Sequence, residues 1–223
     1  LFVNNGFSTI RFNFRGVGKS EGIYDDGEGE LSDAASVLDW LQQYNTNSKT
    51  CWVVGFSFGA WVAMQLLMRR PEINGFISVS PPANIRDFSF LAPCPSSGLI
   101  VHGDKDNIAS FDSTKILAEK LQKQKKVDIK FKPIKGADHF YENYSTQFAE
   151  IQTLYTMDEP GNGDEWTGTP TISSMGQFQV SPSQLSGKVV LMSIPMHNGS
   201  VPLLDGNGSG GKFISYLLKV AFQ

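Results

Sequence analysis

A serine stands between two glycines at the end of an apolar run, in "VVGFSFGAW" at residues 53–61. The pentapeptide GFSFG matches G-x-S-x-G, in which the serine is a nucleophile on a sharp turn between a strand and a helix. Gly55 and Gly59 leave room for the strand and the helix to close up while Ser57 takes a strained conformation. The motif therefore predicts a nucleophilic hydroxyl at Ser57; the alternative is a small residue in an ordinary turn.

A serine nucleophile needs a general base, and the chain has three histidines. His139, in "GADHFY", follows a late apolar run, whereas His197 lies in an irregular region. His102 follows a buried-type strand and is expected to pack or to make a structural hydrogen bond. We expect His139 to be the base, because serine, acid and histidine then follow one another in the order of the α/β-hydrolase triad. The alternative is an ordinary loop histidine.

The acid that orients the histidine is expected in the turn after a strand at 98–103, where "HGDKDNI" holds Asp104 and Asp106. A carboxylate in this turn would lie at the carboxyl edge of the sheet, close to Ser57. We select Asp106 and expect Asp104 to cap the turn. Asp138 is a poor orienter, because a carboxylate adjacent in sequence rarely aligns with the ring.

Strand-like and helix-like segments alternate through the first 150 residues. Apolar, β-prone runs predict strands at 7–14, 50–56, 73–81, 98–103 and 127–134. Apolar residues at helical spacing predict helices at 29–44, 59–71 and 110–124. This alternation is typical of an α/β fold, with a doubly wound, mostly parallel sheet and crossover helices on both faces.

The character of the sequence changes after about residue 150. Residues 157–171 are rich in acids and turn formers, and strands are expected at 177–182 and 188–196. We therefore predict an α/β domain at 1–150 and a C-terminal segment at 151–223 that is irregular or β-rich. This segment is expected to be an appendage, an unrelated segment or an independent binding module.

The composition excludes several classes of protein. Hydrophobic residues make up 40% and charged residues 18%, which is typical of a globular chain. A net charge of −3 gives no sign of the basic surface that binds nucleic acid. No apolar run approaches the roughly 18 residues that a membrane span needs. Cys51 and Cys94 are expected to be reduced thiols, which favours the cytoplasm. No cluster of histidines, cysteines and acids has metal-ligand spacing, so no metal is expected.

Four separated motifs make the sequence similar to the α/β-hydrolase superfamily, and especially to small bacterial serine hydrolases. The motifs are RFNFRGVGKSEG, GFSFGA, the stretch from PPANIRDFSF to VHGDKD, and GADHF, all within residues 1 to about 145. The resemblance implies hydrolysis of carboxylic esters or related small acyl compounds, with no cofactor. It assigns Ser57 as nucleophile, Asp106 as acid, His139 as base, and the backbone N–H of Phe58 as one oxyanion donor.

The likeness departs from the family pattern at both ends. The chain starts at Leu1, after the loop that supplies the second oxyanion N–H in such hydrolases, so we expect the first strands of the fold to be missing. The region after about residue 150 does not match the final helix of the family. The alternatives are a catalytically impaired or silent protein that serves as a binding or structural module, and a peptidase or thioesterase. The expected partner is a small-molecule acyl substrate, not nucleic acid or membrane; the sequence does not define the oligomeric state.

Overall fold

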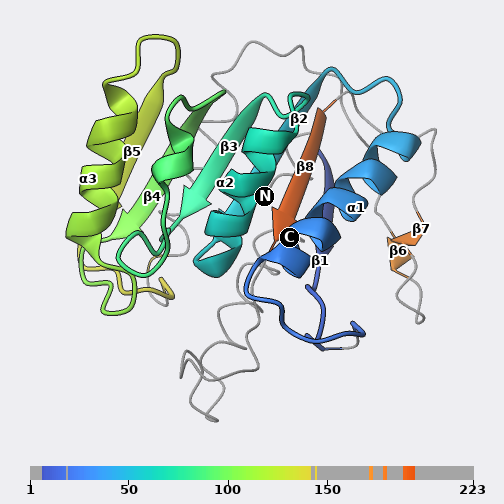
Figure 1. Cartoon of the computed structure of the whole chain (residues 1–223), viewed down its shortest axis with the longest axis horizontal. Coiled ribbons are helices and arrows are strands. Elements are labelled where there is room, and N and C mark those ends of the chain that lie inside the picture. Colours follow the sequence, from blue (N-terminus) through green and yellow to red (C-terminus); the bar gives the residue numbers. More distant parts are fainter. Residues whose placement is uncertain are drawn as a thin grey trace.

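A six-stranded parallel sheet is the centre of the molecule (Figure 1). The computed structural model describes residues 7–18, 20–141 and 144, together with the backbone of three short strands further along the chain. The strands of the sheet, in spatial order, are β1 (Ser8–Phe12), β8 (Lys188–Ser193), β2 (Thr50–Phe56), β3 (Gly75–Val79), β4 (Ser97–Gly103) and β5 (Ile129–Ile134). Every neighbouring pair is parallel, which confirms the predicted α/β class. A separate antiparallel pair joins β6 (Thr171–Ile172) to β7 (Phe178–Gln179).

Three helices connect successive strands of the sheet. They are α1 (Glu28–Tyr44), α2 (Phe58–Arg69) and α3 (Phe111–Gln122), and a short 3-10 helix, η2 (Ser89–Leu91), precedes β4. All three of these helices lie on one face of the sheet (Figure 1). Their crossovers advance in the same direction along the strand order, and right-handed crossovers of that kind place their helices on one side. Within the described residues no helix is both long and apolar enough to cross a membrane.

The sheet separates two hydrophobic clusters. Along β2, Cys51 and Val53 belong to the cluster on the helical face, while Trp52 and Val54 belong to the cluster on the opposite face. The first cluster contains buried residues of all three helices. The second is formed by strand residues, by Phe7 just before β1, and by the chain that follows β5, including Tyr141. Burial on both faces explains why β2, β3 and β4 are nearly continuous apolar runs.

Strand β8 occupies an interior position in the sheet. Its residue Val190 pairs with Thr9 of β1 on one side and with Trp52 of β2 on the other. The sequence predicted a strand over 188–196 but not this location, between two strands of the N-terminal region. The domain boundary at residue 150 stays a prediction, although one strand from beyond it pairs within the sheet.

The loop after β1 is fastened to the start of α1. Gly27 precedes the helix with a φ of 104°, and the buried Glu30 carboxylate accepts hydrogen bonds from the backbone N–H groups of Gly27 and Asp25 at 2.7 and 3.0 Å. Arg15 makes a bidentate pair with Asp33 of the helix, with the Nη2–Oδ1 distance at 2.8 Å. These contacts fix the loop after β1, which lies at the carboxyl edge of the sheet.

Both cysteines are free and buried, as the sequence predicted. Cys51 lies in β2 and Cys94 in the segment before β4. Burial raises the pKa of the Cys51 thiol to about 12, so it stays protonated and unreactive. The two thiols are therefore packing residues.

Candidate active site

Ser57 stands on the turn between β2 and α2 in a strained conformation. Its backbone has φ 52° and ψ −121°, which a non-glycine residue rarely adopts. A Cβ atom on Gly55 would lie 2.3 Å from the carbonyl oxygen of Gly59, so any side chain at position 55 would collide with the first turn of the helix. The G-x-S-x-G pattern thus forms the strand–turn–helix element that the sequence predicted.

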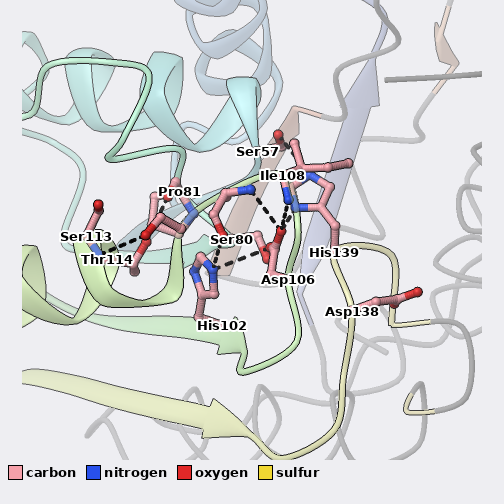
Figure 2. A network of polar contacts seen from close by, with 12 residues as sticks. Ser57, Ser80, Pro81, His102, Asp106, Ile108, Ser113, Thr114, Asp138 and His139 are labelled. Atoms are coloured by element: carbon pink, nitrogen blue, oxygen red, sulfur yellow. Dashed lines mark hydrogen bonds and ion pairs between the residues drawn. The ribbon is translucent and has the colours of Figure 1, made fainter. Parts of the chain in front are cut away.

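Ser57, His139 and Asp106 form a continuous line of hydrogen bonds (Figure 2). The Nε2 atom of His139 lies 3.1 Å from Ser57 Oγ, and its Nδ1 atom lies 2.7 Å from Asp106 Oδ2. A carboxylate only accepts, so Nδ1 carries the proton and Nε2 accepts from the serine hydroxyl. The three residues follow β2, β5 and β4, whose carboxyl ends share one edge of the sheet.

The Asp106 carboxylate is held in its charged form. Burial alone would raise its pKa, but the hydrogen bond and charge of His139 lower it, and the net pKa lies below the ordinary value. The backbone N–H groups of Ile108 and Ala109 also lower it, since they donate to Oδ1 at 2.9 and 2.8 Å. Oδ1 is thus anchored by the turn, and Oδ2 faces the imidazole.

The loop that carries His139 packs closely against the end of β4. A Cβ atom on Gly103 would lie 2.3 Å from the carbonyl oxygen of Ala137, which accepts a hydrogen bond from the Lys105 N–H at 2.9 Å. Asp104 Oδ1 accepts from the Gly136 N–H at 2.6 Å. Asp104 therefore ties two loops together and has no hydrogen bond to the imidazole, while Asp106 does.

The other candidates lie away from this line of side chains or outside the described residues. Asp138 Oδ1 accepts from the backbone N–H of Phe140 at 3.1 Å, as expected for a loop acid, and Figure 2 shows its side chain apart from the His139–Asp106 contact. His197 falls outside the described residues. No group of three or more histidine, cysteine or acidic side chains in the described part of the chain is arranged to hold a metal ion.

His102 contacts the Asp106 carboxylate, and the sequence did not predict this contact. Its Nε2 atom lies 3.0 Å from the Ala109 carbonyl oxygen and 3.4 Å from Asp106 Oδ2 (Figure 2). The carbonyl only accepts, so Nε2 carries the proton, and among the described residues Nδ1 has no hydrogen-bond partner. Burial lowers the pKa of His102, so the ring stays neutral. The structural hydrogen bond was predicted; the only signal for the second contact was the four-residue spacing in "HGDKD".

Phe58, the first residue of α2, contacts residues of both the loop after β1 and the loop after β3. Its backbone N–H is in the first turn of the helix, where N–H groups have no partner within the helix. Its ring centroid lies 5.8 Å from those of Tyr24 and Trp61, and the Arg86 guanidinium lies 5.5 Å from it. Arg86 also pairs with Asp26 at 2.7 Å and donates to the Tyr24 hydroxyl at 2.8 Å. The loops after β1 and β3 therefore meet over Phe58.

The parallel sheet, the strained serine turn and the comparison with known proteins together define an α/β hydrolase. Residues 1–179 match the family described as X-Pro dipeptidyl-peptidase (S15 family). The chain belongs to this family of α/β serine hydrolases.

Three relatives illustrate the similarity. The chain is 51% identical over 161 residues to an uncharacterized protein of Rickettsia prowazekii (strain Madrid E), a match that covers 70% of this chain and 68% of that protein. It is similar to a protein of unknown function, a candidate alpha/beta hydrolase, from Agrobacterium tumefaciens, with a TM-score of 0.62, 52% identity, and coverage of 64% of this chain and 66% of the other. It is also similar to an a/b serine hydrolase without lid from Xanthomonas campestris, with a TM-score of 0.57, 30% identity, and coverage of 67% and 66%. The chain thus spans 66% to 68% of the length of these relatives.

Proposed function

We propose that this protein is a serine hydrolase that acts on carboxylic esters or related small acyl compounds through a Ser-His-Asp triad. The observation that carries the proposal is the line from Ser57 through His139 to Asp106, with contacts of 3.1 and 2.7 Å. In this proposal Ser57 is the nucleophile, His139 the general base, and Asp106 the acid that orients the ring.

The first half of the reaction is acyl transfer to the enzyme. Ser57 Oγ attacks the carbonyl carbon of the substrate while its proton moves to Nε2 of His139. The carbonyl oxygen becomes an oxyanion near the start of α2, where the Phe58 N–H and the helix dipole stabilise negative charge. His139 then returns the proton to the leaving alkoxide, which leaves an ester between the acyl group and Ser57.

Hydrolysis of the acyl-enzyme completes the cycle. His139 takes a proton from water, and the resulting hydroxide attacks the acyl carbon. The second tetrahedral intermediate collapses, His139 Nε2 protonates Ser57 Oγ, and the carboxylic acid leaves. Asp106 stays ionised throughout and keeps the imidazole in the tautomer that presents Nε2 to the serine.

The acyl substrate is expected to be small or of modest size. The segment between β3 and β4 contains only the short helix η2, and the Xanthomonas campestris relative is described as a hydrolase without lid. These observations support a compact, open site. Equal turnover of p-nitrophenyl acetate and of a bulky p-nitrophenyl ester would argue against this substrate range.

A peptidase is the second candidate, because the family matched over residues 1–179 is that of X-Pro dipeptidyl-peptidases. The same triad would then cleave an amide after proline, with His139 protonating the amine that leaves. A panel of a p-nitrophenyl ester, an acyl thioester and Gly-Pro-p-nitroanilide separates esterase, thioesterase and peptidase by their relative kcat/KM.

Labelling with a fluorophosphonate probe tests the proposal as a whole. We expect one covalent adduct on the wild-type protein, located at Ser57, and none on the Ser57→Ala variant. If the wild type forms no adduct, the enzyme proposal is wrong, and the catalytically silent binding module becomes the better description. A cytoplasmic location is part of the proposal; two free, buried thiols are its support, and cell fractionation is its test.

A further inference from the structure

We propose that Ser80 and Tyr141 form a positioning pair that holds the His139 loop against the nucleophile turn. The inference rests on the proposed role of His139 as the base. The Ser80 Oγ and Tyr141 hydroxyl oxygens lie 2.8 Å apart, and the two residues are 0% and 1% exposed. Burial raises the pKa of the Tyr141 phenol well above its usual value, so this hydrogen bond joins two neutral hydroxyl groups.

Both members of the pair have a left-handed backbone conformation. The φ angle is 43° at Ser80 and 54° at Tyr141, and neither residue is a glycine. Such angles are unfavourable, most of all for a bulky aromatic residue, and persist where surrounding contacts enforce them. The hydrogen bond between the two strained residues is a contact of this kind.

Ser80 and the residue before it connect the two reacting side chains. Val79 is the last residue of β3, and its carbonyl oxygen accepts the backbone N–H of Ser57 at 2.9 Å. The next side chain, Ser80, bonds to Tyr141, which lies two residues beyond His139. Two consecutive residues therefore anchor the nucleophile turn and the base loop.

The base loop is held on both sides of His139. On one side, the Ala137 carbonyl oxygen accepts the Lys105 N–H, next to the end of β4. On the other side, Tyr141 is bound to Ser80, whose own N–H donates to the Val101 carbonyl oxygen at 2.9 Å. Release of one side would let the imidazole move relative to Ser57 while the fold stays intact.

Steady-state kinetics with p-nitrophenyl acetate on the full chain test the pair through Tyr141→Phe, Ser80→Ala and the double variant. Each single change is expected to lower kcat by about tenfold to a hundredfold with little change in KM, because small misplacements of a base are costly. The double variant should match Tyr141→Phe, since that change already removes the bond to Ser80 together with the longer contact, 3.5 Å, from the Tyr141 hydroxyl to the Val101 carbonyl oxygen. Tyr44→Phe and Ser96→Ala remove similar hydroxyl groups elsewhere and should leave kcat unchanged.

The second measurement does not depend on turnover. Ring-labelled histidine NMR follows three histidines, and the His139→Gln variant assigns the resonance of interest. We expect Tyr141→Phe and Ser80→Ala to shift the His139 resonance, and the two control variants to leave it unchanged. If Tyr141→Phe fails to fold, Ser80→Ala carries the comparison.

Several outcomes would overturn the pair. The first is that each single variant keeps kcat within about twofold of the wild-type value. The second is that the losses of the two single variants multiply in the double variant. The third is that the His139 resonance stays unchanged even where kcat falls. If the wild type neither labels at Ser57 nor turns over an ester, the proposed function is wrong, and the His139 resonance alone decides whether the pair positions the ring.

Discussion

His139 Nδ1 meets Asp106 Oδ2 at 2.7 Å, although 33 positions separate the two residues in the chain. Water has little access to the pair, because the side chains are 1% and 0% exposed. In such surroundings the carboxylate keeps the proton on Nδ1 and leaves Nε2 free to accept from Ser57. Catalysis is therefore expected to depend on the charge of Asp106 as well as on its shape.

Asp106→Asn is expected to lower kcat by about 10⁴-fold with little change in KM, as in other serine triads. The amide keeps the size of the side chain, but its NH₂ group favours the wrong imidazole tautomer. Steady-state kinetics with p-nitrophenyl acetate measure the effect.

Asp104→Asn is the matched control for that experiment. It changes a carboxylate that bonds the Gly136 N–H and has no hydrogen bond to the imidazole, so we expect less than about a tenfold loss of kcat. Equal losses in the two variants would mean that Asp106 has no special role.

The free energy of unfolding is expected to fall in acid because of two shifted groups. Burial lowers the folded-state pKa of His102, so below the unfolded value of about 6.5 the unfolded chain binds a proton first. The pKa of Asp106 is also lowered, and its contribution, complete above about pH 3.9, is lost as the pH falls through the folded value. Each group contributes a slope of at most about 1.4 kcal/mol per pH unit.

Urea unfolding between pH 7 and pH 3 measures this dependence. His102→Gln should flatten the curve below about pH 6.5, and Asp106→Asn should flatten it below about pH 3.9. A wild-type unfolding free energy that rises in acid would contradict the prediction.

Arg86→Ala is expected to lower both stability and catalytic efficiency. The guanidinium lies 4.7 Å from the Trp61 ring centroid and pairs with Asp26, so its loss should cost about 1–2 kcal/mol of unfolding free energy. The loops after β1 and β3, which meet at Phe58, should then be held less firmly, and this should reduce kcat/KM by up to about tenfold. Thermal unfolding and ester kinetics measure the two effects.

Arg69→Ala is the control for Arg86. Its guanidinium bonds a carbonyl of its own helix, that of Gln65, at 3.1 Å. We expect a change within about 0.5 kcal/mol and normal kinetics. A similar loss in both variants would mean that the contacts of Arg86 with Trp61 and Asp26 make no special contribution.

The interior position of β8 predicts that the C-terminal segment stays bound after cleavage. A protease site engineered within residues 157–171 should yield two fragments that elute together in native gel filtration and separate in denaturant. Fragments that elute separately would support an independent module instead.

Val190→Pro should destabilise the sheet by on the order of 3 kcal/mol, because proline removes a ladder hydrogen bond from a strand paired on both sides.

Local patterns in the sequence predicted much of the fold. The strands and helices up to β5 appear close to their expected ranges, because each is coded by the periodicity of its own apolar residues. Ser57 was selected from the G-x-S-x-G motif, His139 from the order of serine, acid and histidine along the chain, and Asp106 from its place after a strand at the carboxyl edge of the sheet. Their contacts follow from chain order and parallel topology.

Contacts between distant segments were beyond the sequence. Nothing in residues 188–193 specifies that their partners are β1 and β2. Their pairing depends on the open position between those two strands in the sheet. The bond between Ser80 and Tyr141 was missed for a related reason: it depends on how two loops pack, and a hydroxyl group alone carries no signal for its partner.

The position of β8 has a consequence for how the molecule is made. Val189 is synthesised long after its partners Ser8 and Cys51, so β1 and β2 emerge from the ribosome well before the strand that separates them in the folded sheet. Formation of the complete sheet must wait for a late segment to enter between two early ones, a closure of high contact order that slows folding. Until that segment arrives, β1 and β2 lack the partner that lies between them in the folded sheet, and during this interval the nascent chain is most open to misassembly.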